Sequence, residues 1–127
     1  MCGQRKFADR EIDWLIDLAK VWQMPRGWQA IIRAGRCDET NGRPFGLSYA
    51  LILQDESCER LLGFDNSHGF DGAADDNPYD HEHRFGLVGR RYQYHFKSPA
   101  HLLNDFFDRV QSACNASDVK FEFWDDE

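Results

Sequence analysis

The chain has 127 residues, of which 42% are hydrophobic and 29% charged, and its formal net charge is −7 at pH 7. A chain of this length can bury roughly two-thirds of its unfolded surface in one domain, and its hydrophobic content excludes global disorder. The acidic balance argues against a protein that coats nucleic acid nonspecifically, because neutralising phosphates takes clustered Lys and Arg. We therefore expect a single domain over residues 1–127.

Several features of the sequence predict the compartment. No apolar run approaches the roughly 20 residues of a membrane-spanning helix, so we expect no membrane contact. The first residues, MCGQRKFADREIDW, lack the apolar core of a secretory signal. The chain has four cysteines with no close CxxC-type pair typical of zinc sites, and we expect their thiols to stay reduced. These features predict a cytoplasmic protein.

Residues 9–22, DREIDWLIDLAKVW, predict an N-terminal amphipathic helix. Apolar side chains recur at helical spacing, at Ile12, Leu15, Ile16, Ala19 and Trp22. Asp9 is suited to the N-cap position, and Pro25 prevents the helix from continuing.

Four stretches predict strands in the middle of the chain. The first, GWQAIIRAG (27–35), lies between glycines, and the second, LSYALILQD (47–55), alternates apolar residues. A short turn leads to RLLGFDN (60–66), which predicts a hairpin with the preceding strand. The fourth, RRYQYHFK (90–97), alternates aromatic residues with basic or polar ones.

The last part of the chain predicts a second helix and a final strand. Ser98 is a favoured N-cap and Pro99 a favoured first helical residue, so we expect a helix over about 99–114. Residues 119–124, VKFEFW, alternate as a strand does. The expected fold is therefore α+β: an antiparallel sheet of about four to five strands, with the N-terminal helix and the 99–114 helix packed on it.

Charge is unevenly distributed along the chain. Residues 54–80 hold eight carboxylates and one arginine, whereas residues 83–104 hold no carboxylate. The carboxylates Asp71, Asp75 and Asp76 lack the spacing of a calcium-binding loop, so we interpret this stretch as a solvated insertion. The stretch after it can hold an anion locally despite the negative net charge.

DHEHR, at 80–84, is the strongest candidate for chemistry. In an extended segment His81 and His83 lie on one face, and Glu82 and Arg84 lie on the other. Two imidazoles on one face can act as an acid–base pair, because imidazole titrates near neutral pH.

The same histidines have two other interpretations. They can bind a transition metal together with a carboxylate, and the candidate ligands are Asp65, Asp80, His81 and His83. They can also be exposed loop residues without chemistry. Asp65 and Asn66 follow a strand, where such residues often form an Asx turn, and Asp65 can in addition orient a histidine.

Basic and aromatic side chains alternate along and beside the predicted strand 90–97. The residues concerned are Arg90, Arg91, Tyr92, Tyr94, His95 and Lys97. Such interleaving suits contacts with RNA phosphates and stacking on bases. The alternative is that they are ordinary surface residues of a half-buried strand.

Four short motifs follow one another: LLGFDNSHG, DHEHR, YQYHF and SPAHLLNDFFDRV. The residues that carry them are Gly63, Phe64, Asp65, Asn66, Gly69, Asp80, His81, His83, Tyr94, Phe96, Leu102, Leu103, Asp105 and Phe106. Over about residues 46–112 this order resembles the TumE family of toxins from toxin–antitoxin modules. The chain departs from the family pattern in a longer gap before DHEHR, in Glu82 between the histidines, and in the N-terminal helix.

The resemblance implies a toxin whose partner is an antitoxin, typically a helix-turn-helix DNA-binding protein, and it favours an RNA substrate. We interpret the chain as an endoribonuclease that needs no cofactor. One histidine deprotonates a ribose 2′-OH, the other protonates the leaving 5′-oxygen, and Arg84 or Arg91 stabilises the charged phosphorane. The catalytic candidates are His81, His83, Arg84, Asp65 and His95. The candidates for substrate binding are Arg90, Arg91, Tyr94, Lys97 and His68.

Two alternatives stay open. One is a metal-dependent nuclease or phosphoesterase that uses the Asp/His cluster with a divalent metal ion. The other is a non-enzymatic module that acts by protein–protein interaction, which the net charge of −7 and Glu82 favour. The sequence predicts neither the RNA specificity nor whether the chain forms a homo-oligomer.

Overall fold

The computed structural model describes residues 7, 9–40, 43–66 and 80–125. In chain order the elements are α1 (Asp9–Asp17), β1 (Val21–Gln23), the short 3₁₀ helix η1 (Pro25–Gly27), β2 (Gln29–Arg36), β3 (Leu47–Gln54), β4 (Arg60–Asp65), β5 (His81–Arg84), β6 (Leu87–Gln93), α2 (Pro99–Ser117) and β7 (Trp124–Asp125). The strands form one antiparallel sheet in the order β6-β5-β4-β3-β2-β1-β7. The predicted α+β class is confirmed, and the sheet has seven strands instead of four to five.

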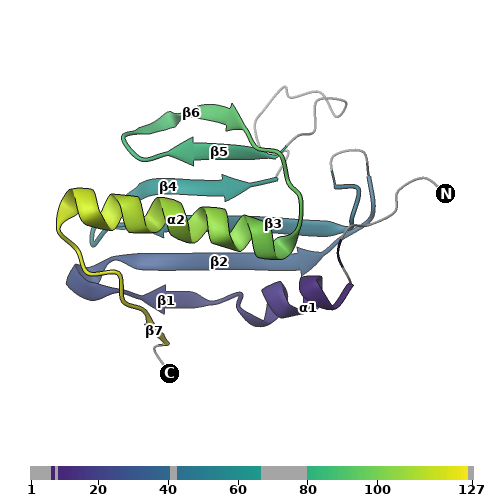
Figure 1. The fold of residues 1–127 in the computed structure, drawn as a ribbon, viewed down its shortest axis with the longest axis horizontal. Coiled ribbons are helices and arrows are strands. Elements are labelled where there is room, and N and C mark those ends of the chain that lie inside the picture. Colours follow the sequence, from purple (N-terminus) through teal and green to yellow (C-terminus); the bar gives the residue numbers. More distant parts are fainter. Residues whose placement is uncertain (1–6, 8, 41–42, 67–79, 126–127) are drawn as a thin grey trace.

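Both helices pack on the same face of the sheet (Figure 1). One core cluster joins Leu15 of α1 and Phe106 of α2 to sheet residues such as Ile32, Leu51 and Phe64, which are successive cross-strand partners. Side chains alternate between the two faces of a strand, so the next residues along each strand point away from the helices. We call this second side the helix-free face, because none of the described helices lies on it.

The helix α2 begins and packs as its sequence predicts. The Ser98 hydroxyl accepts a hydrogen bond from the His101 N–H at 3.1 Å, and Pro99 occupies the first turn. Leu102, Phe106 and Val110 are completely buried against the sheet. Burying each such side chain stabilises the fold by roughly 1.5–3 kcal/mol.

The predicted helix over 9–22 is too long. α1 ends at Asp17, and residues 21–23 form β1 instead. Trp22 pairs with Ala30 of β2, and its ring joins the core from this strand. The spacing of Trp22 in the sequence also fits the apolar stripe of a helix. Only its pairing with Ala30, a residue of another strand, shows that it lies in a strand and not in a helix.

The boundaries of two strands also differ from prediction. β6 covers 87–93, so Tyr94 and Phe96 follow the strand and lie where the chain turns toward α2. The last strand is limited to Trp124–Asp125, because Phe123 packs edge-on against Phe107 of α2 at a centroid distance of 5.2 Å and does not join a ladder.

Some sequence features fall outside the described residues. His68, Gly69 and the insertion carboxylates Asp71, Asp75 and Asp76 are among them. The described cysteines, Cys37, Cys58 and Cys114, are free thiols. Among the described helices, none combines the length and the apolar character needed to cross a membrane.

Candidate active site on the helix-free face

Asn66 anchors the end of β4, where the candidate site begins. Its backbone N–H donates to the Tyr49 carbonyl at 3.3 Å, and its Oδ1 accepts from the Tyr49 N–H at 3.0 Å. Its Nδ2 donates to the Leu47 carbonyl at 2.7 Å. The side chain thus continues the ladder with β3 past the last strand residue and fixes the backbone of Asp65 beside β5.

Asp65, His81 and His83 form a compact cluster on the helix-free face. His81 Nε2 lies 2.8 Å from Asp65 Oδ1, and His83 Nε2 lies 3.9 Å from Asp65 Oδ2. The two imidazoles meet edge to face with their centroids 5.3 Å apart. The sheet creates this geometry, because Asp65 is the cross-strand partner of His81, and His83 lies two residues farther along β5. Three of the five predicted catalytic residues therefore converge.

Gly63 lets β3 and β4 approach closely beside the cluster. It is the cross-strand partner of His83. A Cβ atom at this position would lie 2.9 Å from the Leu51 carbonyl oxygen of β3. Glycine therefore permits the close approach of the β3 and β4 backbones at this point of the sheet.

The cluster is largely shielded from solvent. The side chains of His81, His83 and Asp65 are 5%, 9% and 13% exposed. In such a low-dielectric place a hydrogen bond between imidazole and carboxylate is stronger than in water. The bond to Asp65 keeps a proton on Nε2 of His81, so Nδ1 is the basic atom of the neutral ring.

Asp80 lies next to His81 in the chain but is bonded elsewhere. Its Oδ2 accepts a hydrogen bond of 2.6 Å from the hydroxyl of Tyr49, a residue on the helix-bearing face. Burial raises the pKa of Asp80 to about 6, while the Tyr49 hydroxyl acts in the opposite direction. Burial, reinforced by the charge of Asp80, also raises the pKa of Tyr49. Asp80 is therefore hydrogen-bonded to Tyr49, while the charges of His81 and Asp65 also act on its pKa, in opposite directions.

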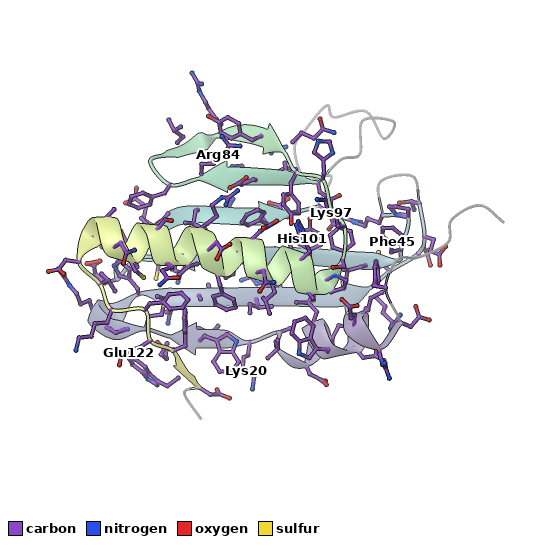
Figure 2. The ribbon with its side chains drawn as sticks, viewed as in Figure 1. Lys20, Phe45, Arg84, Lys97, His101 and Glu122 are labelled. Carbon is purple, nitrogen blue, oxygen red and sulfur yellow. The ribbon has the colours of Figure 1, made fainter. Side chains whose placement is uncertain are left out.

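Arg84 lies across the sheet from the two histidines, toward the helices (Figure 2). Its guanidinium is 3.9 Å from the centroid of the Tyr92 ring, and its Nε is 3.6 Å from Glu82 Oε1. Glu82 is buried and accepts a 2.7 Å hydrogen bond from Nε of Arg109 on α2, which raises the pKa of Arg109. Glu82 thus fastens α2 to the sheet, and the structure does not bring Arg84 to the predicted catalytic cluster.

The strands and the helix that hold this cluster also carry a family signature. A family model described as toxin TumE matches residues 32–113, from β2 into α2. The chain belongs to the TumE family of toxins. No curated protein and no solved structure matches the chain. As a member of a toxin–antitoxin family, this toxin has an antitoxin as its partner.

The predicted substrate-binding residues of the toxin are divided between the two faces. Arg91 lies two residues before Gln93, the partner of His81, so strand alternation turns it toward the helix-free face. Arg90, the preceding residue, is exposed. His95 and Lys97 follow β6 and are also exposed, and no hydrogen bond among the described residues joins His95 to the cluster.

Tyr94 lies on the helix-bearing side. Its hydroxyl donates to Asp105 Oδ2 of α2 at 2.6 Å, and its ring meets Phe64 edge-on at 4.9 Å. His101 Nδ1 lies 3.3 Å from both the Tyr94 hydroxyl and Asp105 Oδ2. Figure 2 shows His101 and Lys97 at the end of α2 where the helix begins. Tyr94 therefore holds α2 to the sheet, and its hydroxyl is engaged by the protein itself.

Two arginines near the cluster were not predicted from the sequence. Arg43 Nε donates to the Asn66 carbonyl at 3.2 Å, and its charge lowers the pKa of Asp80. Arg33 of β2 pairs with Ala50, which pairs with Asp65. Both arginines precede the stretch whose motifs were recognisable. Strand pairing brings Arg33 near the cluster, and the hydrogen bond to Asn66 holds Arg43 there.

Proposed function

We propose that this TumE-family toxin is an endoribonuclease in which His81 and His83 transfer protons and Asp65 holds His81 in place. The observation that carries the proposal is the convergence of two imidazoles on one carboxylate, with the 2.8 Å bond between His81 Nε2 and Asp65 Oδ1 at its centre. Paired proton donors and acceptors of this kind are what cleavage at a ribose 2′-OH requires.

In the proposed reaction, Nδ1 of His81 takes the proton of the 2′-OH. The 2′-oxygen forms a bond to the adjacent phosphorus, and the bond from phosphorus to the 5′-oxygen breaks. His83, in its imidazolium form, gives a proton to the leaving 5′-oxygen. The products are a 2′,3′-cyclic phosphate and a 5′-hydroxyl, and Asp65 stabilises the imidazolium formed on His81.

Access and charge set two conditions on this mechanism. The side chains of His81 and His83 are only 5% and 9% exposed, so the reaction requires that RNA gain access to a buried pair of imidazoles. A cation must also stabilise the phosphorane. Because Arg84 lies on the opposite face, Arg91 is the remaining one of the two arginines predicted for this role.

The proposal is tested by digesting RNA with the purified toxin in the presence of EDTA. We expect His81→Asn and His83→Asn each to lower the cleavage rate at least about 100-fold, with circular dichroism spectra unchanged. His101→Asn is the matched control, because this histidine belongs to α2 and contacts Tyr94 and Asp105 instead of the cluster. Undiminished cleavage in both cluster variants would refute the proposal.

Burial of the cluster favours a second candidate, a metal-dependent nuclease. Two imidazoles and one carboxylate are a common ligand set for transition metals, and these donor atoms lie within 4.8 Å of one another. Donors around one ion at about 2.1 Å lie roughly 3.0–3.4 Å apart, so donor atoms separated by as much as 4.8 Å would have to close by up to about 1.8 Å. Activity that is lost in EDTA and returns only with added Mn²⁺ or Zn²⁺ would select this candidate. A toxin that binds its antitoxin but cuts no RNA in either condition would select the non-enzymatic alternative.

A further inference from the structure

We propose that the helix-free face of the sheet is the surface along which single-stranded RNA binds, and that Arg33 holds a backbone phosphate on it. This inference rests on the proposed endoribonuclease function and extends it from the reacting groups to the path of the substrate. Arg33 lies outside the cluster and outside every motif of the sequence.

Arg33 lies in the same cross-strand row as the cluster. One cross-strand row on the helix-free face runs Arg33, Ala50, Asp65, His81, Gln93. Neighbouring strands lie about 4.8 Å apart, so the Cα atoms of Arg33 and Asp65 are separated by roughly 10 Å. An extended arginine side chain spans much of that distance. A phosphate next to the scissile one therefore comes within its reach.

The described part of the fold does not use the guanidinium of Arg33. The side chain is exposed and has no hydrogen bond or ion pair within the described part of the chain. Arg36, three residues along the same strand and on the other face, instead pairs with Asp13 of α1 at 2.8 Å. A guanidinium that is already solvated and uncommitted can bind a phosphate without breaking an existing contact.

Charge is distributed unequally between the two faces of the sheet. The net charge is −7, yet Asp65 is the only carboxylate that the registers place on the helix-free face among the described strand residues. Glu82 and Asp125, the partners of Tyr92 and Trp22, lie on the helix-bearing face. RNA would thus meet little repulsion on this side of an acidic protein.

The surface around Arg33 has a shape and polarity that suit single-stranded RNA. Ala50 separates Arg33 from Asp65, and beside Arg33 a shallow groove of about 360 Å³ is also lined by Lys20 and Val21. Two rows away on the same face, beyond Ile31 and Ile52, three glutamines are joined by hydrogen bonds, from Gln54 Nε2 to Gln29 Oε1 at 2.6 Å and from Gln29 Nε2 to Gln23 Oε1 at 3.3 Å. Small side chains and amides leave room and hydrogen-bonding groups for bases, as on other sheets that bind single-stranded RNA.

The test is equilibrium binding of a 2′-O-methyl RNA oligonucleotide, which keeps the phosphates but has no 2′-OH to react. Binding is measured by fluorescence anisotropy between about 50 and 200 mM salt. We expect Arg33→Gln to weaken binding about five- to tenfold at the lower salt and to reduce the salt slope by about 0.7, the value of one phosphate contact on a single strand. The control is Arg10→Gln, the same change at an exposed residue of α1.

The outcomes separate this inference from the proposed function. If the wild-type toxin cleaves RNA while Arg33→Gln binds and cleaves normally, the binding path is refuted and the catalytic cluster stands. If binding depends on Arg33 but no RNA is cut, the path is supported and the catalytic proposal fails. Equal losses in Arg33→Gln and Arg10→Gln, or no binding by the wild type, would overturn the inference.

Discussion

At the scale of single residues, the two cluster histidines stand in different relations to one carboxylate. His81 makes a direct 2.8 Å hydrogen bond to Asp65, whereas His83 lies 3.9 Å from the other carboxylate oxygen. Asp65 therefore lies closer to the imidazole of His81 than to that of His83, which suits this carboxylate to orienting His81. This difference is the structural basis for assigning the base to His81 and the acid to His83.

Replacing Asp65 by asparagine tests this division of roles. Asp65→Asn keeps the shape of the side chain but removes the charge that stabilises an imidazolium on His81. We expect the cleavage rate to fall about 100-fold or more, with the melting temperature little changed. The measurement is a single-turnover rate with saturating toxin. A rate equal to that of the wild type would show that Asp65 takes no part in the reaction.

Asp80 gives a prediction about stability and pH. Its pKa is raised from 3.8 to about 6 in the folded protein, so the folded state binds a proton more tightly than the unfolded state. The stability that this proton contributes is complete below about pH 4 and is lost as the pH rises through about 6. Between these pH values, the free energy of unfolding of the wild type should therefore fall by up to about 3 kcal/mol relative to that of Asp80→Asn.

Urea unfolding of the wild type and of Asp80→Asn across pH 4–7 measures this difference. The other carboxylates titrate in both proteins and cancel in the comparison. Asparagine can still accept the hydrogen bond from Tyr49, so the change isolates the charge. A stability difference that does not vary with pH would contradict the account of Asp80.

At the scale of secondary-structure elements, the site depends on how closely β3 and β4 approach at Gly63. A Cβ there would meet the Leu51 carbonyl oxygen at 2.9 Å, and we expect Gly63→Ala to destabilise the protein by about 1–3 kcal/mol. Gly35→Ala in β2 is the matched control, because nothing lies within 4 Å of a Cβ at that position. Thermal unfolding compares the two variants, and equal melting temperatures would show that the close approach carries no constraint.

Arg84 and Arg91 lie on opposite faces of the β5–β6 hairpin, so we expect them to differ in their effect on RNA cleavage. Arg84 packs on Tyr92 on the helix-bearing face, whereas Arg91 alternates onto the helix-free face. We therefore expect Arg84→Gln to leave cleavage within about twofold of the wild type, and Arg91→Gln to lower it at least about tenfold. The rates are measured on one RNA substrate under identical conditions. Loss of activity in Arg84→Gln alone would contradict this assignment of faces.

The same elements show which features a sequence can predict. The helix α2 carries its own start signals, Ser98 and Pro99, and these are local, so its position was predicted. β1 was mistaken for helix, because Trp22 fits a helical stripe and only its pairing with Ala30 of β2 decides the conformation. Information of that kind lies in another part of the chain.

Some features of the candidate site depend on neighbouring residues in the sequence and could be predicted, whereas others depend on how distant strands pair and could not. The shared face of His81 and His83 follows from strand alternation, and the structure confirms it. Arg33 could not be predicted, because its distance from Asp65 depends on the registers of β2 with β3 and of β3 with β4. Arg84 was proposed for a catalytic role although alternation already turned it away from the histidines.

At the scale of the whole molecule, the fold separates its tasks between the two faces of one sheet. The helix-bearing face holds the apolar core and the ion pair of buried Glu82 with exposed Arg109. The helix-free face holds the Asp65–His81–His83 cluster and, by our inference, the RNA. This division allows a strongly acidic toxin to present a surface that is locally compatible with phosphate.

The most direct test of the central claim is the chemistry of the cleaved ends. The wild-type toxin is incubated in EDTA with an oligonucleotide that has a single ribose in an otherwise 2′-deoxy strand, and the fragments are weighed by mass spectrometry. Proton transfer by His81 and His83 predicts cleavage at the ribose alone, leaving a 2′,3′-cyclic phosphate and a 5′-hydroxyl. Fragments with 5′-phosphate ends that form only when a metal ion is added, or an intact oligonucleotide, would contradict it.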